Sequence, residues 1–291
     1  MIKTSILFGL SCFFLILSCS KNSSTTPEPE PTPIDKTANL QGTGDSANDL
    51  LSNDKFTKLK IEIAYVTGFR PTVAAMNDFV DFIRQHTFKQ DIELIYTELE
   101  SPDKEVLSLQ EIAKLESDNR TVYNEGETLG IYIYFADAPD DNDDEEEGLV
   151  TLGAVYRNTS MVIHEVTVRR LAGLSPLITN SDVEGATVNH EFGHLFGLVN
   201  IGSPSVNDHE DTEAVNHCNV NGCLMRAELQ FGSSSKSPVL AATDGTGLKS
   251  ACDLSGFSVL HLLESRASKG LAAAPNLDPE CILDLQANGG R

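Results

Sequence analysis

One short stretch of the sequence has the residue types and spacing needed to bind a metal ion and activate water. His190, Glu191 and His194 follow the pattern H-E-x-x-H, and Gly197 comes three residues later. Side chains four residues apart on a helix project to the same side, so both imidazoles can bind one ion. The glutamate between them lies where it can accept a proton from an attacking water. The stretch predicts a zinc-dependent hydrolytic site with Glu191 as its base.

The residues around this motif predict the helix that must carry it. Ser181 and Glu184 have the spacing of a capping box, in which each side chain bonds a backbone N–H at the start of a helix. We expect a helix from Ser181 to about Phe196, because Gly197 suits the left-handed position that ends a helix. The motif would then occupy the last turns of that helix.

A catalytic zinc ion usually has three protein ligands, and the motif supplies only two. Asn200 stands three residues after Gly197, but its neutral amide oxygen is a weak zinc ligand. Two histidines follow, His209 and His217, and the second directly precedes Cys218. From residue types alone, either histidine can complete the site.

H-E-x-x-H-x-x-G resembles the motif of the metzincin zinc peptidases, in which the chain turns at the glycine and soon supplies a third ligand. His217 and Cys218, followed by Cys223 and Met225, are similar to the stretch H-C-x4-C-x-M of the archaemetzincins, with residues 200–216 as an insertion. The resemblance, which covers residues 183–225, implies His217 as third ligand with His209 as the alternative. It also implies that Met225 is the methionine of the metzincin Met-turn, packed beneath the metal.

The resemblance implies an endopeptidase that uses one catalytic Zn²⁺ ion and Glu191 as general base on a polypeptide substrate. Such a substrate would lie antiparallel to an edge strand of the sheet. Residues 149–156 and 160–168 are the two candidates for that strand. Gly148 and Gly153 would let a substrate backbone approach closely.

Asn200 also supports an alternative, a catalytically inactive relative that binds peptides at the cell surface. The intact Glu191 opposes it, because a purely structural metal site has no use for that carboxylate. A zinc hydrolase acting on small amides and a surface scaffold are further alternatives. Peptidase activity that zinc restores after chelation would separate the enzyme from the non-catalytic alternatives.

The chain has six cysteines, of which four lie in its C-terminal part: Cys218, Cys223, Cys252 and Cys281. An even number in an exported protein favours two disulfides, and three pairings are possible. We favour Cys218–Cys223 with Cys252–Cys281, which closes the fewest long loops. The archaemetzincin pattern continues with a C-x-x-C pair that completes a second, structural zinc site. This sequence lacks that pair, so we favour disulfides over a second zinc.

The N-terminus predicts a lipid anchor. Lys3 precedes an apolar run at residues 6–17, which is too short to cross a membrane as a helix, and Ser18 and Cys19 follow. This layout resembles a bacterial lipoprotein signal, which implies cleavage after residue 18 and a lipid on Cys19. An ordinary signal peptide and an uncleaved anchor are the alternatives. We expect a location in the cell envelope, with the lipid in the outer membrane and the protein on its periplasmic or its surface-exposed face.

Composition restricts the partners and the domain organisation. Forty-three acidic residues against 21 basic ones give a net charge of −22, which argues against nucleic acid as a partner. Residues 20–53 are rich in Ser, Thr, Pro, Asn and Asp, and we expect a disordered tether over 19–53 after a signal at 1–18. The acidic stretch 137–147 predicts a solvated loop, with a Ca²⁺ site as the lesser alternative. We expect a monomer.

Strand and helix patterns alternate from residue 59 onward, which predicts an α/β fold with a twisted mixed sheet. The predicted strands are 59–66, 92–99, 129–136, 149–156 and 160–168, and the predicted helices are 73–86, 107–122, 181–196, 257–267 and 279–287. We expect a catalytic subdomain over 54–197. A smaller, irregular C-terminal subdomain over 198–291 would supply the third ligand and the Met-turn. The pattern of motifs, together with the C-terminal ending at residues 284–290, resembles lipid-anchored, metzincin-type metalloproteases of Bacteroidetes bacteria.

Overall fold

The computed structural model describes residues 35–89, 91–144, 150–226, 256–271 and 274–291. The predicted signal at 1–18, the lipid site Cys19 and Cys252 lie outside the described residues and stay predictions. No helix within the described ranges has the length and apolar character needed to cross a membrane.

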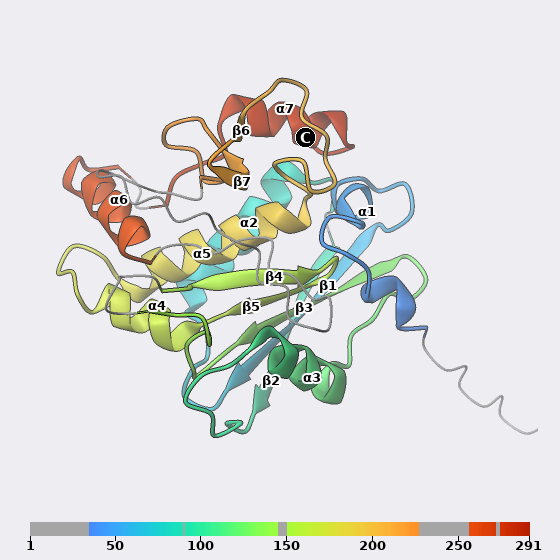
Figure 1. Cartoon of the computed structure of the whole chain (residues 1–291). Coiled ribbons are helices and arrows are strands. Elements are labelled where there is room, and N and C mark those ends of the chain that lie inside the picture. The colour runs from blue at the N-terminus through green and yellow to red at the C-terminus, as the bar shows by residue number, and fades with distance from the viewer. Residues whose placement is uncertain (1–34, 90, 145–149, 227–255, 272–273) are drawn as a thin grey trace, which may run out of the picture. The chain divides into compact units, whose positions relative to one another are not determined.

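A five-stranded mixed sheet forms the centre of the fold (Figure 1). Its strands are β1 (Lys58–Val66), β2 (Asp91–Leu99), β3 (Thr128–Phe135), β4 (Gly153–Arg157) and β5 (Ser160–Ile163). Their order across the sheet is β2-β1-β3-β5-β4, and every neighbouring pair is parallel except β4 with β5. The predicted mixed α/β sheet is confirmed, and β4 is the antiparallel strand at its edge.

Helices cover both faces of the sheet. The longer helices are α2 (Val73–His86), α3 (Leu109–Asn119), α4 (Glu165–Ala172), α5 (Asn180–Leu195), α6 (Gly256–Ser268) and α7 (Pro279–Ala287), with the short α1 (Ala47–Leu51) and a 3-10 turn, η1 (Thr37–Asn39), before β1. A small hairpin, β6 (Glu210–Asp211) and β7 (Ala214–Cys218), lies between α5 and α6 in sequence. Helices α2 and α5 pack together on one face, and α3 packs on the other (Figure 1).

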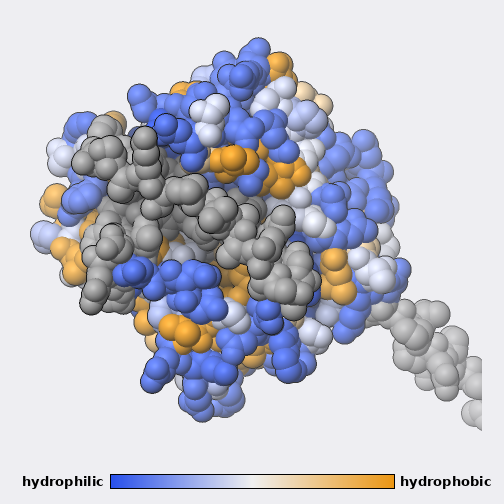
Figure 2. Space-filling model, in the orientation of Figure 1, coloured by the Kyte–Doolittle hydropathy of each residue, from blue (hydrophilic) through white to orange (hydrophobic). Residues whose placement is uncertain are grey.

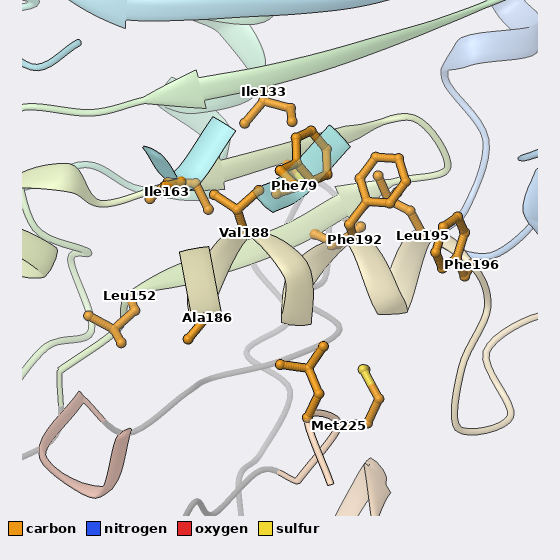
Figure 3. Close-up of a cluster of buried hydrophobic side chains, with 14 of the residues drawn as sticks. Phe79, Ile133, Leu152, Ile163, Ala186, Val188, Phe192, Leu195, Phe196 and Met225 are labelled. Atoms are coloured by element: carbon orange, nitrogen blue, oxygen red, sulfur yellow. The ribbon is translucent and has the colours of Figure 1, made fainter. Parts of the chain in front are cut away.

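The period-two pattern of the strands explains the two layers. Ile61 and Ile63 of β1 belong to the larger core beneath α2 and α5, whereas Ala64 and Val66 belong to the smaller core beside α3. Successive residues of a strand point to opposite faces, so a central strand between two helical layers is apolar on both sides. The larger core also contains the sheet-facing side of α5, as Figure 3 shows for Phe192 beside Phe79.

The predicted end of the last strand of the sheet is wrong. The strand predicted to reach Val168 ends at Ile163, and residues from Glu165 form helix α4 instead. Glu165 accepts a hydrogen bond from Nε of Arg169 at 2.6 Å, four residues on, and Val168 is buried on the helix. The β-branched residues of this stretch favour a strand locally, but packing against the core overrides that weak preference.

The tether predicted to extend to residue 53 is also wrong in its last part, because residues 37–53 belong to the folded domain. Asn39 is fully buried and its amide donates to the carbonyl of Gly130 at 3.0 Å, while Leu50 and Leu51 lie in the larger core. Nζ of Lys89 contacts the carbonyl oxygens of Ser52 and Phe56. Polar composition predicted disorder here, but hydrogen bonds satisfy these polar groups inside the fold.

The predicted division at residue 197 does not separate two cores. The larger hydrophobic cluster includes Phe196, Leu224 and Leu285 together with residues of β1, so it continues across that boundary. On the side seen in Figure 2, the described surface is mainly hydrophilic, with hydrophobic residues in small separate groups. This surface agrees with the acidic composition of the chain.

Candidate metal centre

Helix α5 carries the H-E-x-x-H motif, and its N-cap lies two residues before the predicted cap. Thr179 is the N-cap: Oγ1 accepts from N of Asp182 at 3.3 Å, and Asp182 accepts from N of Thr179 at 2.8 Å. The predicted cap at Ser181 is therefore wrong, because Thr179 and Asp182 supply an equivalent capping box earlier in the chain. Glu184 is buried and accepts from N of Thr72 at 3.0 Å instead.

The predicted helix stop at Gly197 is confirmed. Gly197 has φ of 76°, its N–H donates to the carbonyl of His194 at 3.0 Å, and N of Leu198 donates to the carbonyl of Gly193 at 3.1 Å. This pair of bonds is the Schellman ending of a helix. A Cβ at Gly197 would lie 2.5 Å from N of Ser203, so both the conformation and the close approach require glycine.

Three histidines converge at the end of α5. His190, His194 and His217 each offer one ligand atom, and these atoms lie within 4.8 Å of one another. The Nε2 atoms of His190 and His194 are 3.2 Å apart. Two nitrogens bound to one tetrahedral zinc at about 2.0–2.1 Å would be separated by about 3.3–3.4 Å. The spacing therefore fits a shared zinc ion.

Hydrogen bonds and burial prepare these imidazoles as ligands. Nδ1 of His190 donates to the carbonyl of Leu224 at 2.7 Å, and Nδ1 of His217 donates to the carbonyl of Val215 at 3.0 Å. A carbonyl only accepts, so Nε2 of each ring keeps its lone pair. Burial lowers the pKa of His190 to about 3 and the pKa of His217 to about 4, and it also holds the pKa of His194 well below its usual range. Neutral imidazoles are the form that binds zinc, so the donor set fits this metal.

His217 reaches the site on the small hairpin β6–β7. The hairpin β6–β7 pairs Glu210 with Cys218, so His217 lies next to this pair near the end of β7. The preceding loop is held by helix α7, because N of Val206 donates to Oδ1 of Asp284 at 2.7 Å. Residues 206–218 thus form an ordered support for His217.

The other two candidates for the third ligand lie elsewhere. His209 contacts Asp284 and Cys218 in a separate buried cluster. The amide of Asn200 donates to Glu210 at 2.8 Å, and Oδ1 of Asn200 accepts from N of Ser205 at 3.1 Å. The structure brings His217 to the two motif histidines and does not bring His209 there.

Met225 packs against the active-site helix. It is fully buried, and a Cβ built on Gly193 would lie 2.3 Å from its Sδ. Figure 3 shows Met225 on the side of α5 away from Ile133 and Ile163, which belong to the sheet. The helix is therefore held between the sheet and the Leu224–Met225 turn, whose carbonyl also orients His190.

Glu191 is fully buried and lies against the edge strand β4. A Cβ on Gly153 would come within 2.9 Å of Cγ of Glu191 and 3.1 Å of Cγ2 of Thr187. Gly153 was expected to admit a substrate backbone, but its missing side chain makes room for Glu191. The glycine therefore brings the edge strand and the predicted base together.

The predicted Cys218–Cys223 disulfide is wrong. The described cysteines Cys218, Cys223 and Cys281 are all free and buried, and Sγ of Cys223 is 3.6 Å from Sγ of Cys281. Cys281 is a free thiol here, whereas Cys252, its predicted partner, lies outside the described residues. Long-range packing places these thiols together, and loop length alone could not predict it.

Nothing in the described part of the acidic loop supports the Ca²⁺ alternative. Oδ1 of Asp140 accepts from N and Nδ2 of Asn142, each at 2.9 Å, and Oδ1 of Asp143 accepts from N of Thr151 at 2.7 Å. These carboxylates hold the loop's own conformation. Residues 145–147 of the acidic stretch lie outside the described residues.

Sequence reasoning missed the contribution of helix α7 and of the Leu224 carbonyl. Cys281 and Asp284 lie three residues apart on the helix predicted at 279–287, so they share a face, and that spacing was a usable signal. The bond from His190 to Leu224 spans 34 residues and leaves no local pattern.

No protein-family model matches the chain, and no curated protein matches it. Among solved structures, it is similar to archaemetzincin from Methanopyrus kandleri, with 14% sequence identity and a TM-score of 0.42. The alignment covers 80% of this chain and 96% of that chain. The chemistry available to the site follows from its own geometry, independently of this likeness.

Proposed function

We propose that the protein is a zinc-dependent metalloendopeptidase. The observation that carries the proposal is the convergence of His217 with His190 and His194, beside a buried glutamate on the same helix. Three neutral imidazoles leave a zinc ion its full positive charge and an open coordination position. When bound by these ligands, zinc supplies a Lewis acid that activates water and polarises a peptide carbonyl.

Glu191 has the role of general base in this proposal. Its carboxylate follows His190 in the chain and is fully excluded from solvent. It accepts the proton of the attacking water and then passes a proton to the leaving amine. The backbone carbonyls of Leu224 and Val215 hold two of the imidazoles in the required tautomer throughout.

The edge strand β4 supports a polypeptide substrate. It ends the sheet in the part of the chain that the structure describes, and Gly153 of this strand contacts Glu191. An extended peptide can pair with such an edge through main-chain hydrogen bonds. Pairing there would bring a scissile bond close to the base with little demand on the peptide's side chains.

The inactive-relative alternative loses its support. The hypothesis of an inactive relative depended on Asn200 at the usual ligand position. In the structure, Asn200 forms hydrogen bonds with Glu210 and Ser205, and His217 lies with the two motif histidines. The donor set is therefore complete without Asn200, and a catalytic site is the better explanation of a buried glutamate beside it.

A library of fluorescence-quenched peptides tests the activity with the full chain. We expect cleavage that a chelator abolishes and added zinc restores. Glu191→Gln should keep zinc, because the residue is not a ligand, yet lose cleavage. Glu191→Gln cleavage at the wild-type rate would overturn the role of Glu191, and zinc-independent cleavage would overturn the proposal as a whole.

Metal analysis of histidine variants tests the ligand set. His217→Ala should lose the zinc of the histidine site, whereas His261→Ala is the matched control because His261 is an exposed histidine on α6. Loss of this zinc in both variants, or in neither, would contradict the assignment of His217.

We further propose that a lipid on Cys19 anchors the protein to the bacterial envelope, as its resemblance to a lipoprotein signal supports. Cys19→Ser should move the protein from the membrane fraction to the soluble fraction. An unchanged distribution between the two fractions would remove this part of the proposal.

A further inference from the structure

A second group of potential metal ligands lies beside the histidine site. One donor atom from each of His209, Cys218, Asp278 and Cys281 lies within 4.8 Å of the others, and Cys223 adjoins Cys281. The three cysteines are fully buried, and His209 is 2% exposed. A buried set of this composition has the soft ligands that structural zinc sites use.

Two of the distances between these donors are close to those of a tetrahedral zinc site. Sγ of Cys223 and Sγ of Cys281 are 3.6 Å apart, and Nδ1 of His209 is 3.3 Å from Sγ of Cys218. Two sulfurs bound to one zinc at about 2.3 Å would be about 3.8 Å apart, and a nitrogen and a sulfur about 3.5 Å apart. A disulfide needs about 2.05 Å, so these two sulfurs are not bonded to each other, and their spacing is close to that of two ligands of one ion.

The surrounding groups orient these donors. Nε2 of His209 is 2.7 Å from Oδ2 of Asp284, so Nε2–H donates to the carboxylate and Nδ1 keeps its lone pair towards the sulfurs. Backbone N–H groups donate to two of the sulfurs, from Val220 to Cys218 and from Met225 to Cys223, each at 3.3 Å. A carboxylate behind a histidine ligand is a common arrangement in zinc sites.

We propose that His209, Cys218, Cys223 and Cys281 bind a second zinc ion with a structural role. The archaemetzincin pattern completes its second site with a C-x-x-C pair, which this chain lacks. Here the remaining ligands come from the inserted segment and from helix α7. The inference stands on these four residues and is independent of the reaction proposed for the histidine site.

The Asp278 carboxylate is the competing fourth donor. Its Oδ2 lies 3.2 Å from Sγ of Cys218, but its Oδ1 accepts from N of Glu280 at 2.7 Å and caps helix α7. Closed zinc sites take cysteine and histidine in preference to carboxylate. We therefore assign the fourth position to Cys223, and Asp278→Asn should retain the ion.

This ion would also position the catalytic ligands. Cys218 directly follows His217, and N of Cys218 donates to the carbonyl of Met225 at 2.8 Å. A metal held at this point ties the inserted segment, the Met-turn and α7 into one unit. His209, Cys223 and Cys281 thus act as positioning residues for the histidine site.

Metal content and cobalt spectroscopy test the proposal on the full chain, purified under reducing conditions. We expect about two zinc ions per wild-type chain, and sulfur-to-cobalt charge-transfer absorption after cobalt replacement, because only the second site contains thiolates. His194→Ala should lose one ion and keep the charge-transfer band. Cys281→Ser and His209→Ala should lose or strongly weaken that band, whereas Cys252→Ser is the matched thiol control and should retain it.

Several results would overturn the assignment. These are one zinc ion per wild-type chain with no charge-transfer band, a band lost equally in Cys252→Ser and Cys281→Ser, or loss of the ion in Asp278→Asn. If Cys281→Ser fails to fold, X-ray absorption of the wild-type zinc protein decides the question without any variant. One of the two zinc ions would have three sulfur ligands and the other none, so the average is about 1.5 sulfur ligands per zinc at about 2.3 Å. An absence of sulfur around zinc would refute the second site.

Discussion

The contact between Gly193 and Met225 leads to a quantitative prediction. An alanine Cβ at position 193 would lie 2.3 Å from Sδ and 3.1 Å from Cε of Met225. Unstrained contacts between heavy atoms are about 3.5–4.0 Å, so the sulfur would have to move by more than about 1 Å. Met225 is fully buried in a close-packed interior, which leaves it little room. Gly193→Ala should therefore strain the turn that supports His190.

Gly185 provides the matched control, because it lies on the same helix and is also buried. A Cβ there would meet atoms of Ala75 at 3.8 Å, an ordinary contact. Each substitution replaces glycine within α5, so the gain in helix propensity, about 1 kcal/mol, cancels in the comparison. The remaining difference is the overpacking of Met225, about 1–3 kcal/mol. In a domain of this size, each kcal/mol shifts the melting temperature by about 2–4 °C.

Urea and thermal unfolding of the two variants measure this difference. We expect Gly185→Ala to be at least as stable as the wild type and Gly193→Ala to be less stable than Gly185→Ala. Met225→Ala should relieve the contact, so the double variant should lose less stability than the two single variants combined. Equal stability of the two glycine variants would refute the packing of Met225 against α5.

Three further predictions concern the base, the acid response and the helix start. Gly153→Ala should lower kcat by up to about 100-fold, because the new Cβ would lie 2.9 Å from Cγ of Glu191 and displace that side chain. The metal content should stay the same, and an unchanged kcat would contradict the role of Gly153 in placing Glu191. Burial lowers the pKa of His86 from 6.5 to about 4, so the unfolded state gains its proton first and stability should fall as pH drops from about 6.5 to about 4. In chelated protein, His86→Gln should show a smaller fall than the wild type, because the buried His190, His194 and His217 still contribute to it. A stability difference from the wild type that does not change with pH would contradict the role of His86. Thr179→Ala should lower the free energy of unfolding by about 1 kcal/mol in urea, whereas Ser181→Ala, at the cap predicted from the sequence, should have little effect. A larger loss in Ser181→Ala than in Thr179→Ala would show that Ser181 is the cap.

Local patterns were enough for most strands of the sheet and for two of the three histidines of the metal site. The predicted helix at 73–86 matches α2, and the predicted strand at 59–66 differs from β1 by one residue. These predictions succeeded because side-chain periodicity reports burial within one element. The stretch at 160–168 failed because its β-branched residues favour a strand, whereas packing against the core selects a helix after His164.

The motif by itself determined that His190, Glu191 and His194 lie together on one helix that ends at Gly197, since these relations span only a few residues of regular backbone. The third ligand depended on the tertiary structure. Whether His209 or His217 reaches the site is decided by how the inserted segment packs on helix α7, through contacts such as Val206 with Asp284, 78 residues apart.

The fate of the cysteines was decided in the same way. Sequence spacing favoured a short disulfide between Cys218 and Cys223, but Cys223 instead lies beside Cys281, 58 residues away, and Cys218 lies beside His209. Residue types determined which chemistry the chain can perform, because thiols, imidazoles and carboxylates are fixed by the sequence. Only the fold determined which of them meet, because side chains distant in sequence are brought together by packing that no local pattern encodes.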